Sequence, residues 1–131
     1  MLPQKNIRAA IDKFQKLVEA IPQVEFPIKH YFSKGVYARE MFLPKGHFCV
    51  GKIHKHENLM ILSQGDVSIR SIEGSQRIKA PYTAVSPAGV KRVLYAHEDS
   101  ILTVMHGTDE TDLEKIEAEF IVKSYEELEE A

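Results

Sequence analysis

The sequence predicts a mainly β domain, an antiparallel sandwich or small barrel, with a helix before it and a helix after it. Between residues 27 and 108, short stretches rich in β-branched and aromatic residues alternate with Gly, Pro and polar turns. No long helical pattern interrupts these stretches, which argues against a parallel βαβ sheet. The 131 residues, of which 44% are apolar, fit one domain with a hydrophobic core.

Residues 1–26 hold the first predicted element, an amphipathic helix. Asn6 is a suitable N-cap, and Pro22 is expected to end the helix. Between them, apolar residues recur at helical spacing. They are Ile7, Ala10, Ile11, Phe14, Leu17, Val18 and Ile21. Such a one-sided helix must pack against the barrel or against a second subunit.

Nine strands are predicted in the central part, residues 27–108. They are His30–Phe32, Val36–Leu43, Phe48–His54, Asn58–Ser63, Val67–Ile72, Gln76–Lys79, Tyr82–Ser86, Lys91–Tyr95 and Ser100–Met105. Gly- and Pro-containing turns separate several of them, as in Gln64-Gly65-Asp66 and Pro87-Ala88-Gly89. Many short strands at this spacing are typical of a sandwich or a small barrel.

Residues 109–131 are expected to form an acidic helix and tail. Thr111 and Glu114 have the spacing of a capping box. An apolar stripe follows, made of Leu113, Ile116, Phe120 and Ile121. The segment has ten acidic and two basic residues, a net charge of −8, while residues 1–108 have nine acidic and fifteen basic residues, a net charge of +6. That positive balance favours an anionic ligand but is too dispersed for a nucleic-acid site.

The composition excludes several classes of protein. No apolar run approaches the roughly 20 residues of a transmembrane helix, so no membrane partner is expected. The charged start MLPQKNIRAA lacks the apolar stretch of a signal peptide. Cys49 is the single cysteine, which excludes an internal disulfide and a multi-cysteine zinc site. We therefore expect a cytoplasmic protein.

The segment KGHFCVGKIHKHENLMILSQGDV, residues 45–67, carries a family motif. Gly46, Lys52, His54, Asn58 and Gly65 are spaced as Gly, His-x-His, Glu and Gly are spaced in the first motif of the cupin family. The chain therefore resembles that family of small β-barrels over residues 35–106. The resemblance implies a single-domain, cupin-like antiparallel β-barrel, or jelly roll.

A second cupin motif has Pro-x-Gly, two residues, His, three residues and Asn. Pro87-Ala88-Gly89 is similar to its start, but Arg92 and Ala96 replace the His and the Asn. By position, the family's metal ligands His, His, Glu and His fall on Lys52, His54, Asn58 and Arg92. Lys and Arg are cations at pH 7 and poor metal ligands, so we expect no metal cofactor.

The side chains in these positions predict a pocket for a small anion. Alternate residues of a strand share a face, so Phe48 and Val50 would form an apolar floor below Lys52 and His54. Cys49 would lie on the other face as a small buried hydrophobe. Cationic and amide donors favour a carboxylate, a phosphate or a nucleotide. The predicted ligand-binding residues are Lys52, His54, Asn58, Arg92 and Tyr95.

Each of these polar residues also has a structural alternative. Lys52 would extend into solvent at a strand end. Arg92 would pair with an acid such as Glu57 or Asp99. His54 would be a hydrogen-bonded histidine of the barrel. The sequence leaves these alternatives open.

Two enzymatic interpretations compete with a binding module. In the first, His54, His56 and His106 hold a metal ion, as in a metal-dependent cupin enzyme, but His56 breaks the family spacing to Asn58. In the second, the chain is a metal-independent sugar-nucleotide isomerase or epimerase, as some cupin-like epimerases are. His54 would be the base, and Tyr37 or Tyr95 the acid.

Three segments, GVYAREMFLPKG, GKIHKHENL and GTDETDLEKIEAEFI, resemble small cupin-like proteins encoded in tailed-phage genomes. That resemblance implies a bacteriophage protein in the host cytoplasm or in the virion, with a sequestering or virion-associated role. We also expect a homo-oligomer, a dimer first, because the N-terminal helix has a long apolar face and cupin-like barrels commonly pair through a sheet.

Overall fold

The computed structural model describes residues 4–19, 26–72 and 74–122. Two helices in these ranges, α1 (Gln4–Glu19) and α2 (Leu113–Phe120), accompany eleven short strands. The strands are β1 (Ile28–Ser33), β2 (Val36–Leu43), β3 (Phe48–Val50), β4 (Ile53–His54), β5 (Asn58–Gln64), β6 (Asp66–Ser71), β7 (Gly74–Lys79), β8 (Tyr82–Ser86), β9 (Val93–Ala96), β10 (Ser100–His106) and β11 (Ile121–Val122).

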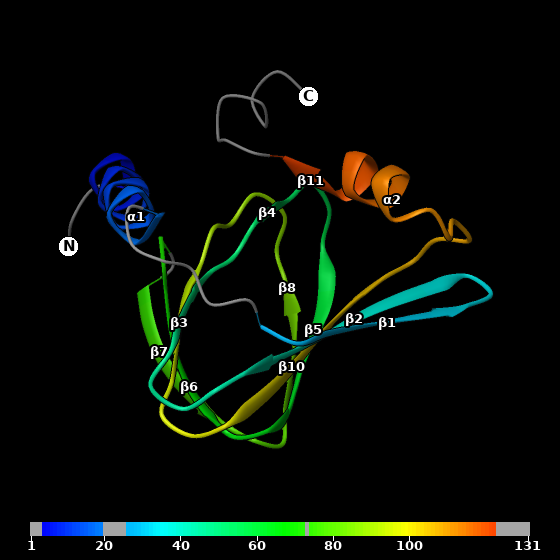
Figure 1. Cartoon of the computed structure of the whole chain (residues 1–131). Coiled ribbons are helices and arrows are strands. Elements are labelled where there is room, and N and C mark those ends of the chain that lie inside the picture. The colour runs from blue at the N-terminus through cyan, green and yellow to red at the C-terminus, as the bar shows by residue number, and fades with distance from the viewer. Residues whose placement is uncertain (1–3, 20–25, 73, 123–131) are drawn as a thin grey trace.

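Two antiparallel sheets face each other and make the body of the protein (Figure 1). One has the strand order β1-β2-β10-β5-β8, and the other has the order β3-β9-β6-β7. β4 and β11 form a third sheet of two strands, which lies next to α2 at one end of the space between the two larger sheets (Figure 1). The sheets do not close into one continuous barrel, but the mainly β jelly-roll architecture with flanking helices is confirmed.

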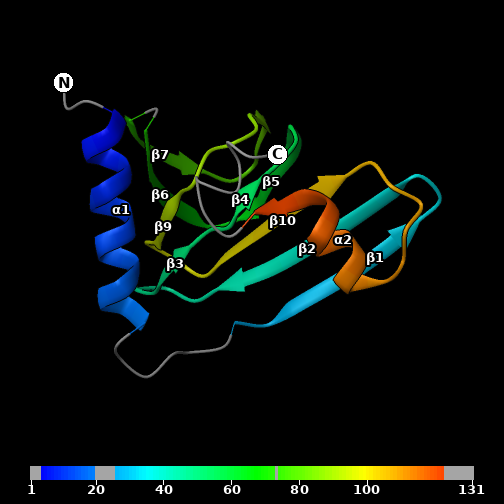
Figure 2. The ribbon, with the colours of Figure 1, turned by 90° about the horizontal axis from the view of Figure 1, so that it is seen from above.

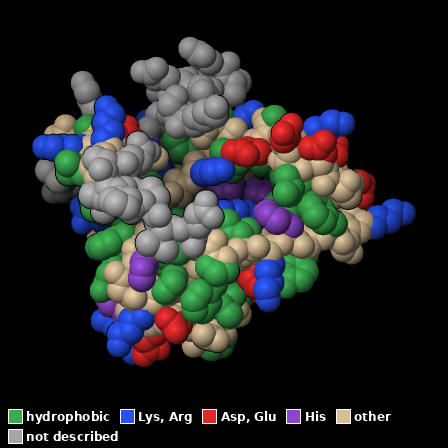
Figure 3. All heavy atoms as spheres, viewed as in Figure 1, with side chains coloured by type: hydrophobic (Ala, Val, Ile, Leu, Met, Phe, Trp, Pro, Cys, Tyr) green, Lys and Arg blue, Asp and Glu red, His purple; other side chains and the backbone are tan. Residues whose placement is uncertain are grey.

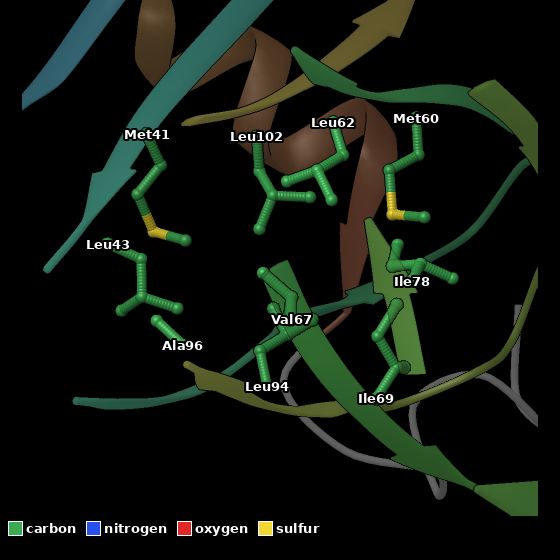
Figure 4. Packing of buried hydrophobic residues seen from close by; sticks show 10 residues of the cluster. All are labelled: Met41, Leu43, Met60, Leu62, Val67, Ile69, Ile78, Leu94, Ala96 and Leu102. Carbon is green, nitrogen blue, oxygen red and sulfur yellow. The ribbon is translucent and has the colours of Figure 1, made fainter. Parts of the chain in front are cut away.

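The hydrophobic core fills the space between the two sheets. Figure 4 shows two facing layers of side chains, one from each sheet. The five-stranded sheet contributes Met41, Leu43, Met60, Leu62 and Leu102, and the four-stranded sheet contributes Val67, Ile69, Ile78, Leu94 and Ala96. Period-two alternation along the strands places these residues inside. Burial of this apolar surface is the main favourable term in folding.

The predicted strands lie within two residues of their expected limits, with one exception. The segment Phe48–His54 is not one strand but two, because the chain leaves the sheet at Gly51 and Lys52. β3 pairs with β9, whereas β4 pairs with β11 of the C-terminal segment. The single alternation predicted through this segment is therefore wrong.

This break reverses the predicted faces of the first part of the segment. Phe48 points outward, is 49% exposed and packs its ring 5.6 Å from Phe14 of α1. Cys49 instead packs against the core, with its Sγ 3.9 Å from Met41 Sδ. Burial raises the pKa of the Cys49 thiol, which fits a small buried hydrophobe rather than a nucleophile.

Helix α1 packs beside the four-stranded sheet (Figures 1 and 2). It begins at Gln4, so Asn6 lies inside the helix and is not its N-cap. Ile7 and Ile11 are buried, but Leu17 is 62% exposed, so the buried stripe is narrower than predicted. The expected end at Pro22 lies outside the described residues.

Helix α2 covers one end of the gap between the sheets. Its N-cap is Asp112, whose side chain accepts hydrogen bonds from the backbone N–H groups of Glu114 and Lys115. The predicted capping box on Thr111 is therefore wrong. The Asp112 carboxylate, directly before the helix, accepts from the backbone N–H groups that a Thr111 cap would have used. Ile116 and Phe120 are buried, as predicted.

The end of α2 differs from the prediction as well. Ile121 leaves the helix and begins β11, whose residues pair with β4. The acidic tail expected from Tyr125 onward lies outside the described residues. No helix in the described part of the chain has the length and apolar character needed to span a membrane.

Candidate functional site

A cavity of about 410 Å³ opens between the two sheets beneath α2. Strands β2, β5 and β10 supply one wall, and β3, β4 and β9 with their connections supply the other. Helix α2 and β11 line its mouth. Figure 3 shows a hollow in this face of the molecule in which Lys, Arg and His side chains gather. The volume is in the lower part of the range for small-molecule sites, roughly 300–1,000 Å³.

The lining has an apolar part and a cationic part. Apolar side chains belonging to the core or next to it form the inner walls: Met41, Cys49, Met60, Leu94, Leu102 and Val104. The polar lining side chains are Arg39, Lys52 and Arg92, the histidines His30, His54 and His106, and Tyr37, Asn58 and Ser86. Glu117 is the one acid among the described residues that line the cavity. The cavity therefore combines an apolar body with an excess of positive charge.

Four of the five predicted ligand-binding residues line this cavity together: Lys52, His54, Asn58 and Arg92. Lys52 reaches Glu117 of α2 with its Nζ 2.8 Å from Oε1. Asn58 is buried and its Nδ2 donates to the carbonyl oxygen of His56 at 3.3 Å. Arg92 donates from a terminal guanidinium nitrogen to Ser86 Oγ at 2.5 Å.

Tyr95, the fifth predicted residue, lies outside the cavity. Its ring packs 4.8 Å from that of Phe48 and 4.9 Å from that of His97. The reason is the alternation of β9, in which Leu94 and Ala96 point into the core and Tyr95 points to the other face. Tyr95 therefore does not share the cavity with the other four predicted residues.

Two histidines stack inside the cavity. The ring centroids of His54 and His106 are 5.0 Å apart, and His106 also stacks on Phe120 at 4.5 Å. The Nδ1 atoms of both histidines are buried without a hydrogen-bond partner in the described part of the chain. These rings therefore form a polar wall of the cavity beside the cations.

The charge state of this pair follows from its surroundings. Burial, with smaller contributions from His106, Arg92, Arg39 and Lys52, lowers the pKa of His54 to about 4. Burial also lowers the pKa of His106, with a smaller contribution from His56. Desolvation and nearby cations both disfavour an imidazolium, so His54 and His106 are neutral at pH 7.

The lining does not fit the divalent metal that the cupin motif would hold. Lys52 and Arg92 stand in two of the ligand positions, and both would repel a cation. His56 packs edge-on against Phe120 at 5.7 Å and does not line the cavity with His54 and His106. Within the described ranges, no group of three or more His, Cys, Asp or Glu side chains is placed to hold a metal ion.

Arg39, a further cation that lines this cavity, was not among the residues predicted from the sequence. Arg39 lies on the inward face of β2, between the buried side chains of Tyr37 and Met41. It makes no hydrogen bond or ion pair with any residue that the structure describes. The signal was present, because period-two alternation from Tyr37 through Arg39 to Met41 puts all three on one face.

Tyr37 and Glu117 complete the set of residues at the site. The Tyr37 hydroxyl is 2.7 Å from Nδ1 of His30, and burial raises the pKa of Tyr37. Glu117 is on α2, one residue after the buried Ile116. Its role depends on how α2 docks across the sheets, so local sequence offers no signal for it.

Solved structures with a similar architecture include two cupin proteins. A cupin-2 domain containing protein from Shewanella frigidimarina is 12% identical, with a TM-score of 0.52 over 72% of this chain and 92% of that one. A cupin domain from Bordetella pertussis is 13% identical, with a TM-score of 0.52 over 67% of this chain and 98% of that one.

A larger protein contains a similar unit. Salicylate 1,2-dioxygenase from Pseudaminobacter salicylatoxidans is 9% identical, with a TM-score of 0.60 over 89% of this chain and 35% of that one. No protein-family model matches the sequence, and no curated protein matches it. At these identities a structural likeness speaks for the fold and not for activity. The two facing antiparallel sheets and these likenesses together show that the chain has the cupin fold.

Proposed function

We propose that this chain is a binding module that holds a small anion with an apolar body in the cavity between its sheets. The observation that carries the proposal is Arg39. Arg39 is half-buried, and its guanidinium makes no ion pair or hydrogen bond with any described residue, although burying a charge is costly unless it is paired. An anionic ligand in the cavity would pair with it.

The neighbouring side chains support the same ligand. Arg92 lines the cavity with Arg39 and offers a planar fork that suits a carboxylate or a phosphate. Neutral His54 and buried Asn58 can orient a polar group of the ligand by hydrogen bonds. The inner walls of Met, Leu and Val side chains suit an apolar ligand body. A carboxylate or phosphate ester with an apolar group fits this lining best.

Thermal unfolding in the presence of anions tests the proposal. The panel holds nucleotides, sugar phosphates, inorganic phosphate and short carboxylates. A ligand that binds the folded state stabilises it by about 2.7 kcal/mol at a hundredfold excess over its dissociation constant. We expect at least one anion to raise the melting temperature of the wild type, and Arg39→Met and Arg92→Ala to abolish that shift.

Arg70→Met is the matched control, because Arg70 lies on β6 away from the cavity and donates to Ser75 Oγ. This variant should keep the full shift. No shift with any anion, or an equal shift in Arg39→Met, would contradict the proposal. A strong loss of stability in unliganded Arg92→Ala would show a structural role for that residue instead.

A specific observation favours a second candidate, the metal-independent isomerase or epimerase. Tyr37 lies in the cavity, where its raised pKa keeps the hydroxyl protonated, and neutral His54 can accept a proton. In this candidate Tyr37, rather than Tyr95, is the acid. Exchange of a carbon-bound ligand proton for deuterium in heavy water, lost in Tyr37→Phe, would support it.

The metal-dependent alternative has no support from the donor set. We expect the protein purified without a chelator to carry well under one equivalent of iron, manganese, nickel or zinc. Stoichiometric metal in elemental analysis, lost in His54→Ala, would favour a metal-dependent enzyme. The sequestering or virion-associated role rests on the sequence resemblance to tailed-phage proteins, and mass spectrometry of purified virions would test it.

A further inference from the structure

Glu117 stands out in a cavity that is otherwise lined by cations and neutral groups. It is the one acid among the described lining residues, and it touches Lys52 at 2.8 Å. We propose that Glu117 is a specificity-determining residue, which restricts the cavity to ligands with a single charged end. This inference rests on the proposed anion-binding function and specifies its ligand class.

The Lys52–Glu117 ion pair spans the mouth of the cavity. The two side chains are 58% and 55% exposed, so they lie at the rim rather than among the inner walls. Lys52 comes from the link between β3 and β4, and Glu117 comes from α2. A ligand long enough to reach from Arg39 to the mouth therefore meets this pair.

Several contacts hold Glu117 in this place. The Nζ of Lys55 donates to the carbonyl oxygen of Ala118 at 2.7 Å, and the backbone N–H of Lys55 donates to the carbonyl oxygen of Phe120 at 2.7 Å. β11 then pairs with β4 directly after the helix. These contacts dock the C-terminal half of α2 and so hold the backbone of Glu117 at the rim.

The distribution of charge explains the selectivity. Arg39 lies on β2 between the buried Tyr37 and Met41, whereas the Lys52 side chain is 58% exposed at the rim. One anionic group of a ligand would bind at Arg39. The charge of Lys52 is already neutralised by Glu117, so a second anionic end at the mouth would meet a carboxylate. Such repulsive elements are a common source of specificity.

Hexanoate and adipate are matched probes, because they share a six-carbon chain and differ in one terminal carboxylate. Calorimetric titration at pH 7.5 would give the dissociation constant of each probe. We expect the wild type to prefer hexanoate, and Glu117→Gln to reduce that preference about fivefold. A fivefold change corresponds to about 1 kcal/mol, the upper end for a partly exposed ion pair.

Lys52→Gln provides a second test of opposite sign. It removes the ammonium group that Glu117 contacts, so a second anionic end at the mouth loses its attraction to Lys52 and the preference for hexanoate should increase. Glu119→Gln is the matched control, because Glu119 is exposed on the same helix and does not line the cavity. It should leave the ratio of the two constants unchanged.

The outcomes separate this inference from the proposed function. If wild type and variants bind both probes with the same preference, Glu117 does not set selectivity, but the anion-binding function stands. If the wild type binds neither probe, the proposed function fails for apolar carboxylates, and the inference fails with it. Opposite shifts in Glu117→Gln and Lys52→Gln would support both, because loss of helix docking would not change sign between them.

Discussion

Desolvation sets the protonation state of His54 in this cavity. Its pKa is lowered to about 4 from the ordinary value of 6.5, first by burial and then by His106, Arg92, Arg39 and Lys52. Between these two pH values the unfolded chain binds a proton at this residue and the folded chain does not. The free energy of unfolding is therefore at its full value above pH 6.5, and it decreases as the pH falls toward 4 because protonation favours the unfolded chain.

We expect the free energy of unfolding to fall by a few kcal/mol over this range, at about 1.4 kcal/mol per pKa unit. Urea unfolding at pH 7.5, 6 and 5 would measure it. His54→Gln should remove part of the pH dependence, because it removes the imidazole whose pKa burial lowers. An imidazole resonance of His54 that titrates near pH 6.5 would contradict the prediction.

Gly65 is a position where the backbone conformation and the close neighbours both disfavour a side chain. Its φ is +102°, which L side chains rarely adopt, and an added Cβ would lie 2.6 Å from Ser100 Cα and 2.7 Å from the carbonyl oxygen of Asp99. We expect Gly65→Ala to cost about 3 kcal/mol through strain and overpacking together. Chemical denaturation would measure this loss.

Gly46 is the matched control for this prediction. Its φ is +82°, but nothing lies within 4 Å of an added Cβ. Gly46→Ala should therefore show only the backbone term, about 1–2 kcal/mol. Equal losses of stability in the two variants would mean that the close approach of Gly65 to Ser100 adds nothing to the cost of the Gly65→Ala substitution.

At the scale of elements, an ion pair joins α1 to the body. Lys91 Nζ is 2.7 Å from Asp12 Oδ1, and the lysine side chain is only 7% exposed while the aspartate is 48% exposed. Asp12→Asn would leave a buried ammonium without its carboxylate. Because Asp12 is half-exposed, we expect a loss of about 2 kcal/mol, between values for exposed and buried pairs.

The double variant separates this pair from the helix itself. Lys91→Met removes the buried charge, so adding it to Asp12→Asn should restore most of the lost stability. Urea unfolding of the wild type, the two single variants and the double variant gives the coupling energy. If the losses simply add, the ion pair does not tie α1 to the sheet.

At the scale of the whole molecule, the β1–β2 hairpin extends away from the core (Figure 2). Its exposed large side chains are Ile28, Tyr31, Phe32 and Val36, each at least 39% exposed. β1 is also an edge strand, and exposed apolar edges tend to pair with another chain. These features agree with the homodimer predicted from the sequence, which stays a prediction.

Light scattering at micromolar concentration would test the dimer. We expect twice the 14.9 kDa mass of the chain for the wild type, and a monomer for Phe32→Glu. Val85→Glu is the control, since Val85 is 58% exposed on β8, the other edge of the same sheet. A wild-type mass near 15 kDa would contradict the prediction.

Much of this molecule follows from local sequence. Period-two alternation and Gly- or Pro-containing turns located the strands, and motif spacing placed Lys52, His54, Asn58 and Arg92 around one cavity. These features depend on neighbours along the chain, and steric rules for strands and turns act at that range. The strands follow from these local rules, whereas the cupin architecture was expected from the resemblance of the motifs to that family.

Other features depend on contacts between distant segments. The pairing of β3 with β9 sets Phe48 opposite Tyr95 on the outer face, and the return of β11 to β4 pairs Ile121 with His54. The ion pair between Lys52 and Glu117 joins residues 65 positions apart. No periodicity carries this information, because the partner of each group is chosen by packing of α2 across the sheets. The sequence determined the strands and the cavity walls, and the tertiary structure decided what lies across the mouth.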